Sequence, residues 1–504
     1  MSPETLLGIA LVVLFTAGAA AMISRTLPAL IVLPIMGFAI AAAAWAITGE
    51  LTSHDVLEGV VSEGAISLHK AMIVTFFGGA LSFVMQRSGV AEQLVKQGAE
   101  LVGADPLAVG VFSLLLVALL FSSLTGLGAV IMVSMIVLPM LSTVGLSPAA
   151  GAGIVLFGMS LGGVVNPANW VIYVETLGVP IEDVQRFALA LFAIVTLGGV
   201  AMILVELFRG RLIRLDARTS VILLGFLGVI GGVALWQSGW GSSGAPDLEA
   251  DAGDSALLLW SRRIVLAGFV LLLLRMLVDL VRRASRWRHQ TATIRGWAYL
   301  IPVVPLIAIL LFDVPILAAF AIGFVYAILA TARPGSLALS VQCLIEGGAS
   351  VMPAIILMIG IGILIAAVKG PADWAATHTG SPWPVLAAIE PILEKLVPSS
   401  PLGYVLGFGL AAPLALYRGP LNVWGLGFGV ATILLGAQSL PAAAIMAMLL
   451  SVGQVQGICD PTNTANVWIA HHQGVDVNAL MLRTLPFVWG GVFIGLALSA
   501  AWFL

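Results

Sequence analysis

The chain has 504 residues, of which 60% are hydrophobic and only 9% are charged, and its mean hydropathy is +1.10. This composition excludes a soluble globular protein and is typical of a helical protein that crosses a membrane many times. The net charge of −3 does not argue for nucleic acid as a partner, and two cysteines are too few for a disulfide framework. We therefore predict an all-α polytopic membrane protein that contacts membrane lipids and has no nucleic-acid partner.

Apolar stretches long enough to cross about 30 Å of hydrocarbon occur along the whole chain. About twelve transmembrane helices are predicted, at 6–23, 27–47, 71–86, 149–177, 187–207, 219–236, 257–281, 298–312, 315–332, 351–369, 442–472 and 485–504. The residues before the first span are acidic rather than basic, so we predict a retained span there and not a signal peptide.

Two further apolar stretches, 107–141 and 401–436, are too long for one crossing and are interrupted near their middles. The interruptions are Ser122-Ser123-Leu124-Thr125-Gly126 and Arg418-Gly419-Pro420-Leu421-Asn422. We predict two re-entrant helical hairpins, and two ordinary spans for each stretch are the alternative, because hydropathy alone does not locate a turn in depth. With both hairpins, and with the N- and C-termini outside, most lysines and arginines face the cytoplasm, as the positive-inside rule requires.

Two of the predicted spans contain helix-breaking residues. Asn166-Pro167-Ala168-Asn169 interrupts 149–177, and Asp460-Pro461-Thr462-Asn463-Thr464-Ala465-Asn466 interrupts 442–472. Proline removes a backbone donor, and Asp, Thr and Asn offer the backbone other hydrogen-bond partners. A broken helix is tolerated in lipid only where it lines a protected cavity, and two such helices in matching positions indicate a transporter's binding site.

The order of these landmarks is repeated. An amphipathic stretch, a hairpin, a broken span and a final span occur in both halves, and an odd number of crossings separates the two copies. We therefore predict inverted repeats at 1–207 and 298–504, joined by a two-helix connector at 208–297. In this arrangement the two hairpin tips meet at mid-membrane, and Asp460 corresponds to Asn166.

The hairpin tips and helix breaks supply the predicted substrate site, because half-helix ends present unpaired N–H groups and carbonyls to a ligand. The candidate substrate-binding residues are Ser122, Ser123, Thr125, Gly126, Asn166, Asn169, Arg418, Asn422, Thr462, Asn463 and Thr464. For any single small residue, close helix packing is the alternative. Arg418 is either the fork that holds a substrate carboxylate or a structural residue that pairs with Asp460 or caps a helix C-terminus.

Asp460 and Asn466 are the candidate ion-coupling residues. A carboxylate within the membrane either takes a proton or binds sodium beside Thr462, Asn463 and Thr464, and this coupling ion is the only cofactor predicted. The alternative is that Asp460 only caps the second half-helix. His471 and His472 are expected to be solvated, and the arginines at 282–288 are expected to contact lipid headgroups.

One motif points to an enzyme instead. Gly158-Met159-Ser160-Leu161-Gly162 matches the nucleophile-elbow pattern, but that pattern joins a strand to a helix, and this one lies inside an apolar helical run. We predict that the protein is not an enzyme, and an intramembrane hydrolase is the alternative, which mutation of Ser160 tests.

In its hairpin at Ser122–Gly128, its Asn166-Pro167-Ala168-Asn169 break and its segment from Asp460 to Trp468, the chain resembles the ion transporter superfamily, nearest to the gluconate permease and citrate-proton symporter branch. The resemblance implies secondary active uptake of an organic anion by a transport domain that moves, like an elevator, against a dimeric scaffold. The Ser-Asn-Thr tips of the sodium-dicarboxylate branch are absent from this sequence.

We therefore predict a homodimeric symporter of the bacterial inner membrane that couples a proton, or else sodium, to an organic carboxylate of the gluconate, citrate or dicarboxylate type. Two alternatives within transport are a cation-proton antiporter and the large permease subunit of a binding-protein-dependent carboxylate carrier.

Overall fold

The computed structural model describes residues 2–24, 26–212, 294–333, 336–371, 382–398, 400–436 and 438–504, with isolated positions at 267–278, 374 and 378. The described residues form helices and loops, without a β-strand. The predicted span at 219–236, most of the one at 257–281 and the arginines at 282–288 lie outside the described residues.

Eight helical segments of this part of the chain are long and apolar enough to cross a membrane. They are α1 (Pro3–Ile23), α2 (Ala29–Thr48), the segment Asp55–Ser88 that ends in α4 (His69–Ser88), α8 (Pro148–Val165), α10 (Ile181–Arg209), α15 (Ser336–Lys369), the broken helix α20 (Ala442–Cys459) with α21 (Thr464–His472), and α22 (Val477–Phe503). The predicted all-α polytopic membrane fold is thereby confirmed.

The spans predicted at 298–312 and 315–332 are shorter than expected. The first contains a 3₁₀ helix at Gly296–Leu300 and then α13 (Val304–Phe312) of only 9 residues, and the second is α14 (Ile316–Ala330) of 15 residues. At about 1.5 Å per residue, neither helix reaches across about 30 Å of hydrocarbon. Prolines at the start of α13 and the left-handed Asp313 at its end limit its length.

Both predicted hairpins are interrupted where expected. The first consists of α6 (Pro106–Phe121) and α7 (Leu127–Thr143). The second consists of α18 (Pro401–Ala411) with the 3₁₀ helix η4 (Ala412–Arg418), followed by the π-helix η5 (Val423–Gly427) and α19 (Phe428–Gly436), and it is bent by 99° at the break. The re-entrant path of both hairpins stays a prediction.

The repeated landmarks have repeated local structures. Amphipathic helices of 13 residues, α5 (Val90–Val102) and α17 (Pro384–Leu396), precede the two hairpins. The helices before them, α4 and α15, are each followed by a left-handed glycine, Gly89 with φ +80° and Gly370 with φ +88°. The inverted orientation of the two copies stays a prediction.

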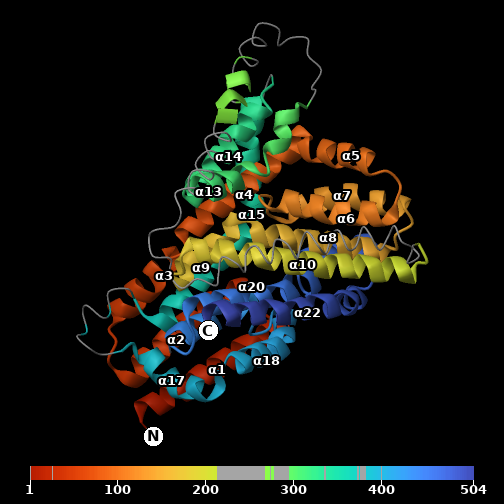
Figure 1. Cartoon of the computed structure of the whole chain (residues 1–504). Coiled ribbons are helices and arrows are strands. Elements are labelled where there is room, and N and C mark those ends of the chain that lie inside the picture. The colour runs from red at the N-terminus through yellow and green to blue at the C-terminus, as the bar shows by residue number, and fades with distance from the viewer. Residues whose placement is uncertain are drawn as a thin grey trace, which may run out of the picture.

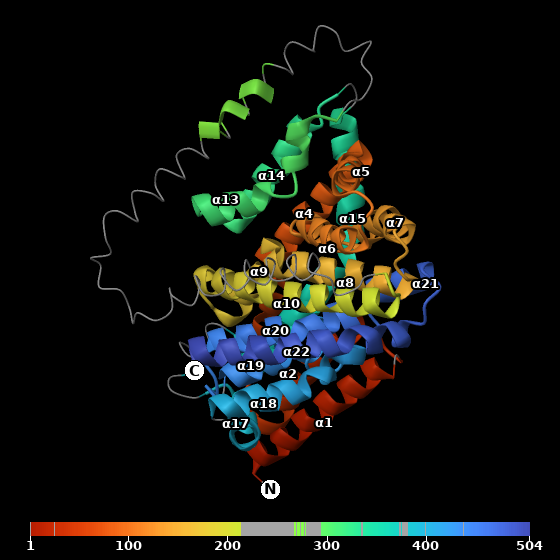
Figure 2. The ribbon, with the colours of Figure 1, turned by 45° about the vertical axis from the view of Figure 1, so that its right-hand side comes forward.

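The two broken helices lie at the centre of the molecule. Figures 1 and 2 show α8 and α10 of the first half beside α20 and α22 of the second half. Both α8 and α20 are buried along most of their length. On the cytoplasmic side of the predicted topology, the buried Glu206 of α10 binds Arg483 of α22 at 3.1 Å and Arg209 at 2.8 Å. The helix breaks are therefore enclosed by protein, as broken backbone in a membrane requires.

Glycines bring α4 and α15 into backbone contact. A Cβ atom on Gly347 would lie 2.6 Å from the backbone of Gly79 and Ala80, and those atoms cannot move away as a flexible side chain can. We expect Gly347→Ala to destabilise the fold by about 1–3 kcal/mol, the usual cost of overpacking. The measurement is the melting temperature of the purified protein in detergent. Gly490→Ala is the matched control, since nothing lies within 4 Å of its Cβ position, and an equal melting temperature for both variants would contradict close packing here.

Candidate functional site

The helix breaks are built by asparagine caps. Asn166 ends α8 and also caps α9 (Pro167–Leu177), because its Oδ1 accepts from the N–H of Ala168 at 3.0 Å. In the second half, Asp460 ends α20, and Asn463 caps α21 by accepting from the N–H of Ala465 at 3.1 Å. The second break is therefore longer than the first.

This difference corrects the predicted alignment of the two breaks. The amide of Asn169 donates to the carbonyl six residues earlier, at Gly163, and Asn466 donates to the carbonyl of Asp460 across the same spacing. Asn463 and Asn466 are thus the counterparts of Asn166 and Asn169. Asp460 matches Asn166 only as the residue that ends the first half-helix, because three residues, 460 to 462, are added before the second cap.

The tip of the second hairpin has a strained backbone. Tyr417 and Arg418 have φ values of +54° and +57°, and left-handed conformations cost non-glycine residues about 1–2 kcal/mol each. Gly419 follows, and a Cβ atom there would collide with the carbonyl oxygen of Leu414. Strain of this kind persists where surrounding contacts hold it, and it is found most often at functional sites.

The carboxylate of Asp460 supplies these contacts. Its Oδ1 accepts from the N–H of Tyr417 at 3.0 Å, and from the N–H and hydroxyl of Thr462 at 2.9 and 2.8 Å. Its Oδ2 accepts from Nδ2 of Asn422 at 3.2 Å. Asp460 is 1% exposed and joins the helix break to the hairpin tip.

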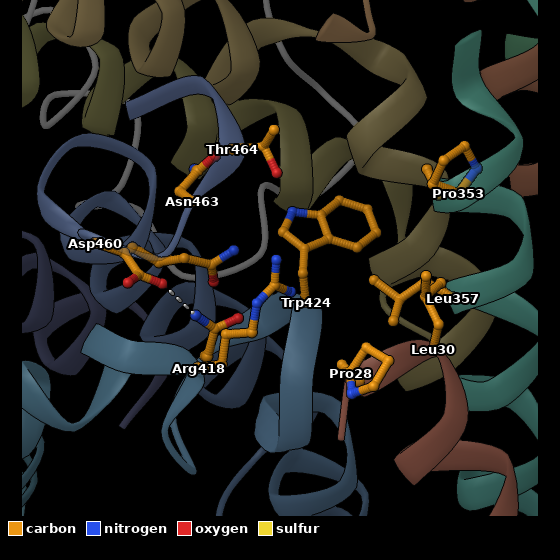
Figure 3. A pocket seen from close by; sticks show the side chains of 13 residues that line it. Pro28, Leu30, Pro353, Leu357, Arg418, Trp424, Asp460, Asn463 and Thr464 are labelled. Atoms are coloured by element: carbon orange, nitrogen blue, oxygen red, sulfur yellow. Dashed lines mark hydrogen bonds between the residues drawn. The ribbon is translucent and has the colours of Figure 1, made fainter. Parts of the chain in front are cut away.

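A cavity of about 370 Å³ opens beside this junction. The hairpin and the break supply its polar wall, and the start of α2 and the middle of α15 supply its apolar wall. Its lining residues are Pro28, Ala29, Leu30, Pro353, Ala354, Leu357, Arg418, Asn422, Trp424, Gln456, Asp460, Asn463 and Thr464. Figure 3 shows the Arg418 side chain extending into this first cavity, close to Trp424.

Arg418 has no carboxylate partner among the described residues. The four hydrogen bonds to Asp460 come from other groups, and the salt bridges of the described chain do not include Arg418. The predicted alternative of a structural Arg418–Asp460 pair is therefore not seen. A guanidinium that lines a cavity without a carboxylate partner among the described residues is available to bind an anion.

A second cavity of about 180 Å³ shares a wall with the first. Trp424, Gln456 and Asn463 line both cavities. The rest of its lining comes from both broken helices and the second hairpin: Ser160, Gly163, Val164, Asn169, Ile172, Tyr173, Val423, Phe428, Leu450, Gly453, Gln454 and Gly457. All the side chains that line the second cavity are uncharged.

The shared wall offers hydrogen-bond donors. Oε1 of Gln456 accepts from the N–H of Val423 at 2.7 Å, and Oδ1 of Asn463 accepts within its cap, so the acceptors of both side chains are occupied. The side-chain N–H groups of Gln456, Asn463 and Trp424 make no hydrogen bond with the described residues. Together with Arg418, this arrangement suits a ligand rich in acceptor oxygens. Asn422 offers an acceptor instead of a donor, because its buried Oδ1 accepts no hydrogen bond from the described residues.

The predicted site residues of the first hairpin lie elsewhere. Ser122, Ser123, Thr125 and Gly126 line neither cavity. Ser122 donates to the carbonyls of Leu119 and Pro302, and the backbone of Thr125 is held by Ser82 of α4. The hydroxyls of Ser123 and Thr125 are buried and have no hydrogen-bond partner in the described part of the chain. The first tip packs against α4 and the loop before α13, and it also contacts the first helix break, where Asn166 donates to the carbonyl of Phe121. The meeting of both hairpin tips at one substrate site stays a prediction.

The remaining predicted residues divide into two groups. Asn169, Arg418, Asn422, Asp460, Asn463 and Thr464 line the cavities. Asn166, Thr462 and Asn466 do not line them but hold the breaks: Asn166 donates to the carbonyl of Phe121, Thr462 to Asp460, and Asn466 to the Asp460 carbonyl. His471 and His472 are exposed, as expected.

Trp424, Gln456, Gln454 and Tyr173 are cavity residues that the sequence analysis missed. Gln454 and Gln456 were the detectable signal, because two glutamines inside an apolar span are unusual and such polar residues generally face a cavity or a partner. Tyr173 and Trp424 carry no such signal, since aromatic residues are common in apolar segments.

The chain is similar to solved structures such as the following one, which is of a membrane transporter. The crystal structure of the Alcanivorax borkumensis YdaH transporter matches over 93% of this chain and 98% of that chain, with 15% sequence identity and a TM-score of 0.49. No family model and no curated protein matches the chain.

Proposed function

We propose that the protein is a secondary active transporter that binds an organic carboxylate at Arg418 and moves it across the bacterial inner membrane. One observation carries this proposal. The guanidinium of Arg418 lines a cavity beside a helix break and has no anionic partner among the described residues. A planar guanidinium matches a carboxylate with two parallel hydrogen bonds. The free N–H groups of Trp424, Gln456 and Asn463 add donors to the same wall.

Asp460 is the proposed coupling group, with Asn466 as its neighbour. It is a carboxylate buried at the helix break, and it lines the same cavity as Arg418. Protonation would remove its charge and weaken its hold on the hairpin tip, so a proton bound here is linked to the conformation of the site. Sodium coupling is the second possibility, for which the unpartnered Oδ1 atoms of Asn422 and Asn466 are available oxygens.

A cation-proton antiporter fits this site less well. Its cation would share the cavity with Arg418, which repels it. An intramembrane hydrolase is also less well supported. The hydroxyl of Ser160 donates to Oε1 of Gln454 at 2.7 Å, and an amide oxygen is not a general base.

The proposed mechanism is alternating access by an elevator-like motion of the hairpins and broken helices against a dimeric scaffold. The hydrogen bonds between the second hairpin and its helix break support this motion. Asp460 accepts from the N–H of Tyr417 and Gln456 accepts from the N–H of Val423, so the two elements are held together as one unit. An element that moves as one body can carry its bound substrate with it.

The direct test is transport by the purified protein in liposomes. We expect an inward proton gradient to drive accumulation of one or more radiolabelled acids among gluconate, lactate, citrate, succinate and malonate, with a sodium gradient tested in parallel. Uptake without an added soluble protein separates a symporter from the permease subunit of a binding-protein-dependent carrier. If a correctly folded sample accumulates none of these acids under either gradient, the carboxylate proposal is wrong and the antiporter is the next to test.

A further inference from the structure

We propose that the second cavity is a subsite for an uncharged, oxygen-bearing group of the transported acid, distant from its carboxylate, and that Tyr173 determines the specificity of this subsite. The inference rests on the proposed transport of an organic carboxylate. It assigns a role to a cavity in which only Asn169 and Asn463 were candidates for substrate binding.

The second cavity lies beside the first. It meets the first at the wall of Trp424, Gln456 and Asn463, so a ligand held by Arg418 lies next to it. A cavity needs only about 10–15 Å³ to hold one water molecule, so 180 Å³ has room for a group of several atoms.

The lining of the second cavity contains polar groups. Tyr173 is only 6% exposed, and its hydroxyl makes no hydrogen bond with the described residues. Its ring is fixed by Phe428, with the two centroids 5.7 Å apart. The donor and acceptor positions of this hydroxyl are therefore open to a ligand oxygen, which would gain a hydrogen bond there. Ser160 and Gln454, joined at 2.7 Å, add a second polar group to the same cavity.

The lining of the second cavity disfavours a charged group. The described lining of the two cavities contains one arginine, and the second cavity has no charged side chain. A second carboxylate placed there would lose its hydration without gaining a counter-charge. The subsite therefore accepts a hydroxyl or carbonyl group and rejects a second carboxylate, which favours monocarboxylates over dicarboxylates.

The test compares acids that differ only at the end opposite the carboxylate. The probes are butyrate, hexanoate and octanoate, their terminal hydroxy derivatives, and the dicarboxylates succinate, adipate and suberate. The measurement is the Kd of each probe for the purified full-length protein, by calorimetry. At the chain length that reaches Tyr173, we expect the terminal hydroxyl to tighten binding about tenfold and the second carboxylate to weaken it relative to the hydroxy acid by at least about tenfold.

Tyr173→Phe is the decisive variant. It removes only the oxygen, which has no partner in the described protein, so we expect the fold to be unchanged. The variant should lose the tenfold preference for the hydroxy acid and bind the parent acid within about twofold of the wild type. Tyr299→Phe is the matched control, because Tyr299 lines neither cavity.

The possible results separate the two proposals. If the parent acids bind and depend on Arg418, but a hydroxyl gives no advantage at any chain length, or Tyr173→Phe leaves that advantage intact, the subsite is refuted while the proposed function stands. If the dicarboxylate binds more tightly than the hydroxy acid, charge selection is refuted. If none of the acids binds, both the proposed function and the subsite are refuted.

Discussion

Arg418→Ala is expected to abolish gradient-driven uptake of the carboxylate. The substitution removes the one arginine of the described cavity lining, and truncating one partner of a buried, hydrogen-bonded charge pair costs about 2–5 kcal/mol. This corresponds to a loss of substrate affinity of at least about thirtyfold. Arg418→Lys keeps the charge but not the planar fork, so we expect an intermediate result, with uptake retained and KM raised about tenfold. The measurement is the initial rate of uptake into liposomes as a function of substrate concentration.

The fold should tolerate the loss of this side chain. Arg418 makes no salt bridge with the described residues, so the melting temperature of Arg418→Ala should stay close to that of the wild type. Lys96→Ala is a control for the loss of a positive charge, since Lys96 lies on α5 and pairs only with Glu92 on the same helix. Wild-type uptake by Arg418→Ala would show that another group holds the substrate.

The elements that could be predicted from the sequence are those determined by local chemistry. The break at Asn166 and Pro167 and the break after Asp460 were predictable, because a proline and a capping side chain end a helix wherever they occur. The hairpin tip at Arg418 to Asn422 was predictable for the same reason. The length of α13 could not be predicted. The run at 298–312 is apolar enough for a membrane span whether or not its first residues are helical.

The composition of the cavities depends on packing between elements distant in sequence. Ser122 and Thr125 have the residue types of a binding site, yet the first hairpin tip packs against α4 and lines neither of the two cavities, which local sequence alone does not reveal. Conversely, Trp424 and Tyr173 line one cavity because η5 and α9, which are distant in sequence, both pack against α20. The alignment of the two breaks was also ambiguous. Asn166 both ends α8 and caps α9, whereas in the second break Asp460 ends α20 and Asn463 caps α21.

Asp460→Asn is expected to separate transport from its driving ion. The amide keeps the shape of the side chain and one acceptor oxygen for Tyr417 and Thr462, but it does not ionise at neutral pH. If Asp460 carries the coupling proton, gradient-driven accumulation should fall at least tenfold. Exchange of labelled for unlabelled substrate across the membrane should continue, because exchange does not require net movement of the ion. The measurement compares these two assays on the same liposomes.

A structural role predicts a different pattern. In Asp460→Asn, the new amide N–H₂ group faces Nδ2 of Asn422, 3.2 Å away in the wild type, and two opposed donors cost about 1–3 kcal/mol. If this contact is the whole role of Asp460, accumulation and exchange should fall together with the melting temperature. The double variant Asp460→Asn/Asn422→Asp restores one donor and one acceptor at this contact. It also removes the amide that donates to the carbonyl of Ala415 at 2.9 Å, so we expect only part of the lost stability to return. Full accumulation by Asp460→Asn alone would exclude this carboxylate as the coupling group, because no ionisable group would remain at position 460 to take the proton.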